Sequence, residues 1–144
     1  MQYIYVINGP NLNMLGQRES EIYGVRTLQS IELLCAQKLQ SSNYRLRFLQ
    51  SNNEGDIVSF IHSACTDAAG IVINAAAYSH TSIAILDALQ IFSGPVAEVH
   101  ISNIYQRESF RQHSYCAQRA DAVISGCGAR GYLYALDFIL EKLT

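Results

Sequence analysis

Short apolar runs alternate with segments of helical spacing along the chain, and this alternation limits the possible folds more than any other feature. The apolar runs at 3–7, 46–49, 70–73, 96–99 and 122–124 are expected to form strands. Between them, apolar residues recur every three or four positions, as in the segments 28–39, 57–64, 83–89 and 132–143. Strands and helices joined by such short connections predict right-handed βαβ units and a parallel sheet covered on both faces.

The second strand differs from the others. Its segment Arg45-Leu46-Arg47-Phe48 alternates charged and apolar residues, which is typical of an edge strand. We therefore predict an α/β fold, a flavodoxin-like three-layer sandwich with a five-stranded parallel sheet in the order 2-1-3-4-5. No linker or repeat interrupts the 144 residues, so a single domain over 1–144 is expected.

Composition and charge limit the kinds of partner that the chain is expected to bind. Hydrophobic residues make up 49% of the chain and charged residues 15%, which excludes a disordered protein, and a net charge of -2 favours neither nucleic acid nor anionic lipid. The first residues lack the basic segment and long apolar run of a signal peptide, and no stretch is long enough to cross a membrane. The four cysteines show no CxxC spacing and are expected to be free. These features predict a cytoplasmic protein that binds a small molecule.

Polar residues gather where the predicted strands end. The first strand runs into Asn8-Gly9-Pro10-Asn11, the third into Asn74, and the fourth into His100-Ile101-Ser102. Open α/β sheets bind ligands outside the carboxyl ends of their strands. These segments are therefore expected to face one crevice.

A polar stretch bounded by glycines, residues 16–24, follows the first strand and precedes a helix that Thr27 is expected to cap. It has the composition of a mobile lid, although an ordinary surface loop is the better interpretation on spacing alone. Tyr23 could act as a base only if its phenol were ionised near neutral pH, and Arg18 is the local cation that could favour ionisation.

Glu98 and His100 alternate on the fourth strand, so their side chains point to the same face. The carboxylate could orient the imidazole for general acid catalysis; a structural ion pair is the competing interpretation. His80 is expected to begin the third helix with Asp87 two turns along it, although a cap and a solvated charge are the plainer interpretations.

Two arginines lie after the fourth strand. Arg107 and Arg111 would share a helix face if 108–112 is helical, and either could bind a carboxylate or belong to a solvated basic surface.

The segment Gly126-Cys127-Gly128-Ala129-Arg130-Gly131 fits GxGxxG but opens the last helix, so a tight turn with close helix packing is predicted rather than a dinucleotide site. The two lysines, Lys38 and Lys142, lie away from the predicted crevice, which disfavours Schiff-base chemistry. Without metal-binding or nucleotide motifs, no cofactor is expected.

Several of these segments together carry a resemblance to a known family. They are Gly9-Pro10-Asn11-Leu12-Asn13, Arg18 with Ile22-Tyr23-Gly24, Ser79-His80-Thr81-Ser82, and Glu98-Val99-His100-Ile101-Ser102-Asn103. Over nearly its whole length the chain resembles type II 3-dehydroquinate dehydratases. The resemblance implies a carbon-oxygen hydro-lyase that removes water from 3-dehydroquinate by anti elimination through an enolate, giving 3-dehydroshikimate.

The resemblance also implies residue roles. Tyr23 matches the base, His100 the acid and Arg18 the residue that lowers the tyrosine's pKa. The remaining matches are Asn11 and Glu98 as supports, and Asn74, His80, Asp87, Ile101, Ser102 and Arg111 as substrate-binding positions. Asp87 matches a residue that reaches in from a neighbouring subunit of a dodecamer built from trimers. Departures are Ser20, where many relatives have proline, and Tyr105, where histidine is common.

Two other functions fit parts of the pattern. A flavodoxin-like module for a flavin or phosphate ligand would use the turn 8–11, but this turn lacks the hydroxyl-rich phosphate loop expected there. A receiver domain would need an acidic pair where the first strand ends in Asn8.

Overall fold

The structure, a computed structural model, describes residues 2–17 and 26–144. Five parallel strands form one sheet in the order β2-β1-β3-β4-β5. The strands are β1 (Tyr3–Asn8), β2 (Arg45–Gln50), β3 (Ala68–Asn74), β4 (Val96–His100) and β5 (Ala122–Ser125). The predicted strand order and the flavodoxin-like arrangement are confirmed, with β2 at an edge.

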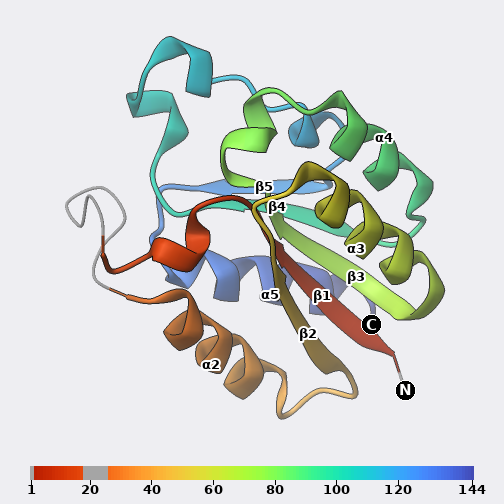
Figure 1. Cartoon of the computed structure of the whole chain (residues 1–144). Helices are drawn as coiled ribbons and strands as arrows, with labels where there is room; N and C mark the ends of the chain where they lie inside the picture. Colours follow the sequence, from red (N-terminus) through yellow and green to blue (C-terminus); the bar gives the residue numbers. More distant parts are fainter. Residues whose placement is uncertain (1, 18–25) are drawn as a thin grey trace.

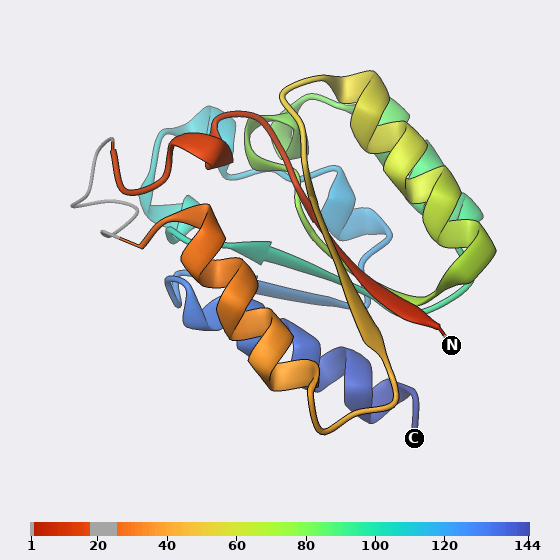
Figure 2. The ribbon, with the colours of Figure 1, turned by 60° about the horizontal axis from the view of Figure 1, so that its bottom comes forward.

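Helices cover both faces of the sheet (Figure 1). On one face lie α2 (Leu28–Leu39) and α5 (Arg130–Lys142), and on the other α3 (Glu54–Asp67) and α4 (Ile83–Ile91). Figure 2 shows the sheet between these two layers. No helix in the described ranges is long and apolar enough to cross a membrane.

The strands alternate their side chains between two cores. In β1, Ile4 and Val6 pack toward α2 and α5, while Tyr5 and Ile7 pack toward α3 and α4. All four are at most 1% exposed. Because both faces of a central parallel strand are buried, its sequence reads as an unbroken apolar run. The same alternation directs Glu98 of β4 to the α3 and α4 side of the sheet, opposite Val99.

Hydroxyl side chains fix where two helices begin. The Thr27 hydroxyl accepts a hydrogen bond from the Ser30 N–H at 3.1 Å, as predicted for the start of α2. The Ser82 hydroxyl accepts one from the Ile85 N–H at 3.0 Å, so α4 begins at Ile83. His80 therefore does not begin this helix, and the prediction is wrong in that detail. It ends a preceding 3₁₀ helix, η2 (Ala76–His80).

The segment after β4 is irregular rather than α-helical. It forms the short 3₁₀ turns η3 (Ile104–Gln106), η4 (Ser109–Arg111) and η5 (Cys116–Gln118). Arg107 lies just after η3, and Arg111 ends η4, so they do not share one helix. The Gln112 side chain donates to the carbonyls of Tyr105 at 3.2 Å and Arg107 at 3.0 Å, and satisfies backbone groups that a helix would otherwise pair.

Candidate active site

A pocket opens at the carboxyl edge of the sheet, where the sequence predicted a crevice. It forms because the chain turns sharply after β1 and passes close to the segment after β3. A Cβ atom on Gly9 would lie 2.3 Å from the Ala75 carbonyl oxygen, so only glycine allows this approach. The pocket is lined by Pro10, Asn11, Leu12, Leu15, Asn74, Ala76, Ala77, His80, His100, Ile101, Ser102, Ile104, Arg107 and Arg111.

Seven predicted site residues meet in this pocket although they come from four separate parts of the chain. They are Asn11, Asn74, His80, His100, Ile101, Ser102 and Arg111. Asp87 lies instead on the exposed face of α4 and does not line the pocket of its own chain. Arg18 and Tyr23, with most of the predicted lid at 16–24, lie outside the described residues.

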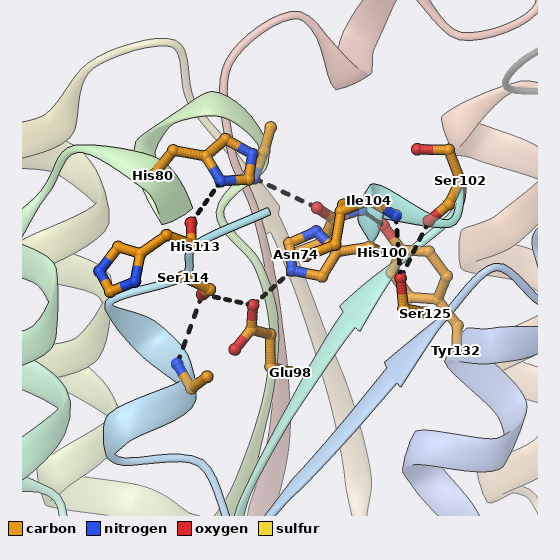
Figure 3. Close-up of polar contacts among 12 residues, drawn as sticks. Asn74, His80, Glu98, His100, Ser102, Ile104, His113, Ser114, Ser125 and Tyr132 are labelled. Carbon is orange, nitrogen blue, oxygen red and sulfur yellow. Dashed lines mark hydrogen bonds and ion pairs between the residues drawn. The ribbon is translucent and has the colours of Figure 1, made fainter. Parts of the chain in front are cut away.

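His100 is held from below by a buried carboxylate (Figure 3). Its Nε2 contacts Oε2 of Glu98, and Glu98 is 0% and His100 4% exposed. The Ser114 hydroxyl donates to the same Oε2 at 2.6 Å. Because a carboxylate only accepts, Nε2 of His100 carries the proton in this contact. Nδ1 of His100 is thereby left for a ligand.

His80 lies beside His100, with ring centroids 6.3 Å apart and an interplanar angle of 18°. The Nδ1–H of His80 donates to the His113 carbonyl oxygen at 2.7 Å, because a carbonyl can only accept. Burial lowers the pKa of His80 below its ordinary value, and the charges of His100 and Arg111 act in the same direction, against the His113 hydrogen bond. The neutral form of His80 is therefore favoured, and in that form its Nε2 is a hydrogen-bond acceptor.

Asn74 is oriented by a directional chain of hydrogen bonds beneath the pocket. Its Oδ1 accepts from the Ala76 N–H at 3.2 Å, and its Nδ2 donates to the Tyr132 hydroxyl at 3.0 Å. That hydroxyl donates to Asn8 Oδ1 at 2.7 Å, and Asn8 Nδ2 donates to the Leu49 carbonyl at 3.0 Å. Because each hydrogen bond in this chain has a fixed direction, the orientation of the Asn74 side chain at the pocket is also fixed.

Replacing Tyr132 with phenylalanine should lower the free energy of unfolding by about 2 kcal/mol, since it leaves buried amide groups of Asn8 and Asn74 without a partner. Urea denaturation measures this loss. Tyr134→Phe on the same helix is the control, because Tyr134 is 43% exposed and should change stability by less than ~0.5 kcal/mol. Equal stability of the two variants would contradict a structural role for the Tyr132 hydroxyl.

The glycine-rich turn before α5 supports the loop that follows β4. The Gly126 N–H donates to the His100 carbonyl at 3.2 Å, and the Gly128 N–H to that of Ile101 at 3.0 Å. Gly126 has φ +91° and Gly128 φ +63°, conformations that favour glycine. A Cβ on Gly131 would lie 3.0 Å from Val99 Cγ2. The predicted tight turn and close helix packing are both confirmed.

The same loop offers backbone donors at the rim of the pocket. The Ser125 hydroxyl donates to the Ser102 carbonyl at 3.2 Å and accepts from the Ile104 N–H at 3.2 Å, which holds the loop in place. Within the described part of the chain, the N–H groups of Ile101 and Ser102 donate to no other residue. Unused, fixed N–H groups of this kind suit an anionic oxygen.

The pocket also carries positive charge. Within the ranges described, its lining includes two permanently charged side chains, Arg107 and Arg111. Glu108 pairs with both arginines from outside the lining, at 3.2 Å from Arg111 Nε and 3.7 Å from Arg107 Nε. An anionic ligand is therefore favoured over a cationic one.

Reasoning from the sequence missed the residues that support the site. Ser114 lies in an irregular segment, and the spacing of residues 132–143 places Tyr132 only on the apolar face of the last helix. Tyr132 meets Asn8 across 124 positions of sequence, and Ser114 meets Glu98 across 16. No spacing pattern marks such contacts, although a tyrosine on a helix face that packs on a sheet does need a partner for its hydroxyl.

Comparison with known proteins agrees with this geometry. The family model for class II dehydroquinases matches residues 2–140. The chain is 53% identical to a 3-dehydroquinate dehydratase of Bartonella tribocorum, over 97% of this chain and 94% of the relative. It is 56% identical to that of Streptomyces coelicolor, over 94% of this chain and 87% of the relative.

A solved structure is similar throughout. The crystal structure of a type II dehydroquinase from Butyrivibrio crossotus superposes with a TM-score of 0.93 at 42% identity, covering 96% of this chain and 97% of the other. The sequence match, the shared fold and the pocket at the same sheet edge as the family motifs lead to one conclusion: this chain belongs to the class II dehydroquinase family.

Proposed function

We propose that this chain is a type II 3-dehydroquinate dehydratase, a hydro-lyase that converts 3-dehydroquinate to 3-dehydroshikimate and water in the shikimate route to aromatic amino acids. One observation carries the proposal beyond family membership. The Glu98-supported imidazole of His100 faces a pocket that also holds Arg111 and the amides of Ile101 and Ser102. A proton donor and a carboxylate site thus lie in one cavity.

The reaction assigns one proton transfer to each catalytic group. The phenolate of Tyr23, assisted by Arg18, removes a proton from the carbon next to the ketone, and an enolate forms. The enolate electrons then form the carbon–carbon double bond as the carbon–oxygen bond breaks, and His100 gives its Nδ1 proton to the departing hydroxyl. Water leaves, and the proton gained by Tyr23 returns to His100 to complete the cycle. No cofactor enters this sequence.

The ring carboxylate and the ring hydroxyls of the substrate bind to different groups of the pocket. The ring carboxylate is held by the Ile101 and Ser102 N–H groups, which Ser125 and the 126–128 turn support. Ring hydroxyls meet Asn74, the neutral Nε2 of His80 and the guanidinium of Arg111. Asn11, whose N–H donates to Asn52 Oδ1 at 3.0 Å, lies beside the enolising carbon.

The deciding experiment is to incubate the purified protein with 3-dehydroquinate and follow the ultraviolet absorption of the conjugated enone product. Product should form without additives and in the presence of a chelator. A folded protein that forms no product would contradict the proposal. Thermal stabilisation by FMN, without stabilisation by a dehydroquinate analogue, would instead support the flavin- or phosphate-binding alternative, which the family match does not favour.

We also propose that the protein assembles into trimers, and these into a dodecamer, so that Asp87 enters a neighbouring subunit's site. Ile83, Asp87 and Ile91 recur every four residues along α4 and form an exposed stripe. Ile83 is 55% and Ile91 66% exposed in the isolated chain. Two exposed isoleucines on one helix face support burial against another subunit.

Replacing Ile91 with glutamate should therefore shift the protein to a smaller species and lower kcat/KM, which light scattering and kinetics measure. Leu33→Glu on α2 is the control: Leu33 is 61% exposed but lies on the other side of the sheet, and its variant should keep the trimer. An unchanged mass for Ile91→Glu would reject this face as the trimer contact.

The cytoplasm is the location we propose. All four cysteines are free, and Cys65 and Cys127 are also exposed. Exposed thiols without disulfides are typical of proteins kept in a reducing compartment.

A further inference from the structure

Ser114 supplies the second hydrogen bond to the carboxylate that supports His100. The residue is 9% exposed and lies between η4 and η5, in the segment that crosses the α3 and α4 side of the sheet above Glu98. Its hydroxyl proton can go to only one acceptor, and Glu98 Oε2 lies 2.6 Å from its oxygen. The Ala117 N–H, at 3.4 Å, occupies the acceptor side of the same oxygen. The direction of the Ser114 to Glu98 hydrogen bond is therefore fixed.

Glu98 has few alternatives to this contact. It is fully buried, and both His100 and Ser114 bind its Oε2. Its Oε1 has no hydrogen-bond partner among the described residues. A buried carboxylate held through one oxygen can turn about its last side-chain torsion unless two donors fix that oxygen. Without Ser114, the Glu98 carboxylate would be held only by the His100 imidazole, which is the group that Glu98 positions.

The segment around Ser114 also holds the second histidine. The His113 carbonyl accepts the Nδ1–H of His80, and the Tyr115 N–H donates to the Ser79 carbonyl at 2.8 Å. Residues 113–115 therefore contact His80, the adjacent Ser79 and the Glu98 carboxylate that supports His100, as Figure 3 shows for His113 and Ser114. A shift of this segment would move His80 and His100 together.

We propose that Ser114 is a positioning residue for the dehydration: it locks the Glu98 carboxylate, which in turn directs His100 toward the departing hydroxyl. This inference rests on the proposed function. Ser114 does not line the pocket and touches no substrate, so its loss should affect the step that uses His100 rather than binding.

Four variants test the proposal by steady-state kinetics. Ser114→Ala should lower kcat about 10-fold or more and change KM by less than about threefold, as for other groups that orient a reacting side chain. Ser114→Thr keeps the hydroxyl and should recover most of the kcat, whereas Ser114→Cys keeps the shape with a weak donor and should not. The control is Ser42→Ala, since the Ser42 hydroxyl also donates to a carbonyl (Leu39, 2.7 Å) and accepts an N–H (Tyr44, 3.1 Å), at the opposite edge of the sheet. Ser42→Ala should keep the wild-type kcat.

A second measurement needs no turnover. The chain has four histidines, so ring nitrogen signals in ¹⁵N-histidine NMR spectra can be assigned by substitution. Ser114→Ala should move the His100 ring signals and speed exchange of its Nε2 proton with solvent, while the exposed His62 stays unchanged. An inactive wild-type enzyme would refute the proposed function but leave this test intact. Unchanged His100 signals in Ser114→Ala, or a cysteine variant as active as the threonine variant, would overturn the role of Ser114.

Discussion

Replacing His100 with asparagine is expected to lower kcat about 10³-fold, in the range that a single general acid contributes. Asparagine keeps a polar side chain of smaller size, but its amide N–H groups are far too weakly acidic to transfer a proton to a leaving hydroxyl. Because the loss falls on the transition state, kcat and kcat/KM should fall together, and substrate binding should change by less than about threefold. The enone assay gives kcat at saturating substrate and kcat/KM at low substrate.

This substitution is also expected to lower folding stability, because it removes a partner of the buried Glu98 carboxylate. The Glu98 carboxylate is fully buried, and removal of His100 leaves Ser114 as its remaining hydrogen-bond donor among the described residues. Breaking a buried pair from one side costs about 3 kcal/mol of folding stability. Thermal melting must therefore accompany the kinetics, with Glu98→Gln as the companion variant that keeps a hydrogen-bonding group at that position but removes the charge. A folded His100→Asn enzyme within tenfold of wild-type kcat would remove His100 from the mechanism.

The sequence predicted the sheet well because parallel strands are buried on both faces. Each central strand reads as an apolar run, and β2 could be assigned to an edge because Arg45 and Arg47 alternate with the apolar residues Leu46 and Phe48. The order 2-1-3-4-5 was then predicted as that of the flavodoxin-like fold, which has its second strand at an edge. The convergence of Asn74 and His100 at one edge followed from the sheet as well, since all strands of a parallel sheet end on the same side.

Details outside the regular elements could not be predicted in the same way. The 3₁₀ helix that ends at His80, and the turns around Arg107 and Arg111, are stabilised by particular contacts such as those of Gln112. Such contacts join side chains to backbone groups without any periodicity that a sequence displays. The support of Glu98 by Ser114 belongs to the same class, because it depends on how an irregular segment crosses the sheet.

The described tyrosines narrow the choice of base. Burial raises the pKa of Tyr132 well above its ordinary value, and its hydroxyl is committed to Asn8 and Asn74. Burial and the Asp67 carboxylate raise the pKa of Tyr5 to about 12. Neither phenol would ionise near neutral pH, and no tyrosine lies among the described residues of the pocket lining. These observations agree with our proposal that the base is Tyr23, which lies in the family motif outside the described residues.

Tyr23→Phe is accordingly expected to lower kcat by about 10³-fold to 10⁴-fold while a dehydroquinate analogue still binds within about threefold of wild type, as calorimetry would measure. An ordinary phenol has a pKa of about 10, so a base that works near pH 7 needs about 4 kcal/mol of preferential stabilisation of its phenolate.

A nearby guanidinium can supply this stabilisation, so the role of Arg18 is tested with a second variant, Arg18→Met. Activity rises with pH as the base ionises, and loss of the cation raises the pKa of the base. The rising limb of the kcat profile should therefore move to higher pH in Arg18→Met. A limb that stays in place would show that Arg18 does not tune the base, and substantial turnover by Tyr23→Phe would show that Tyr23 is not the base at all.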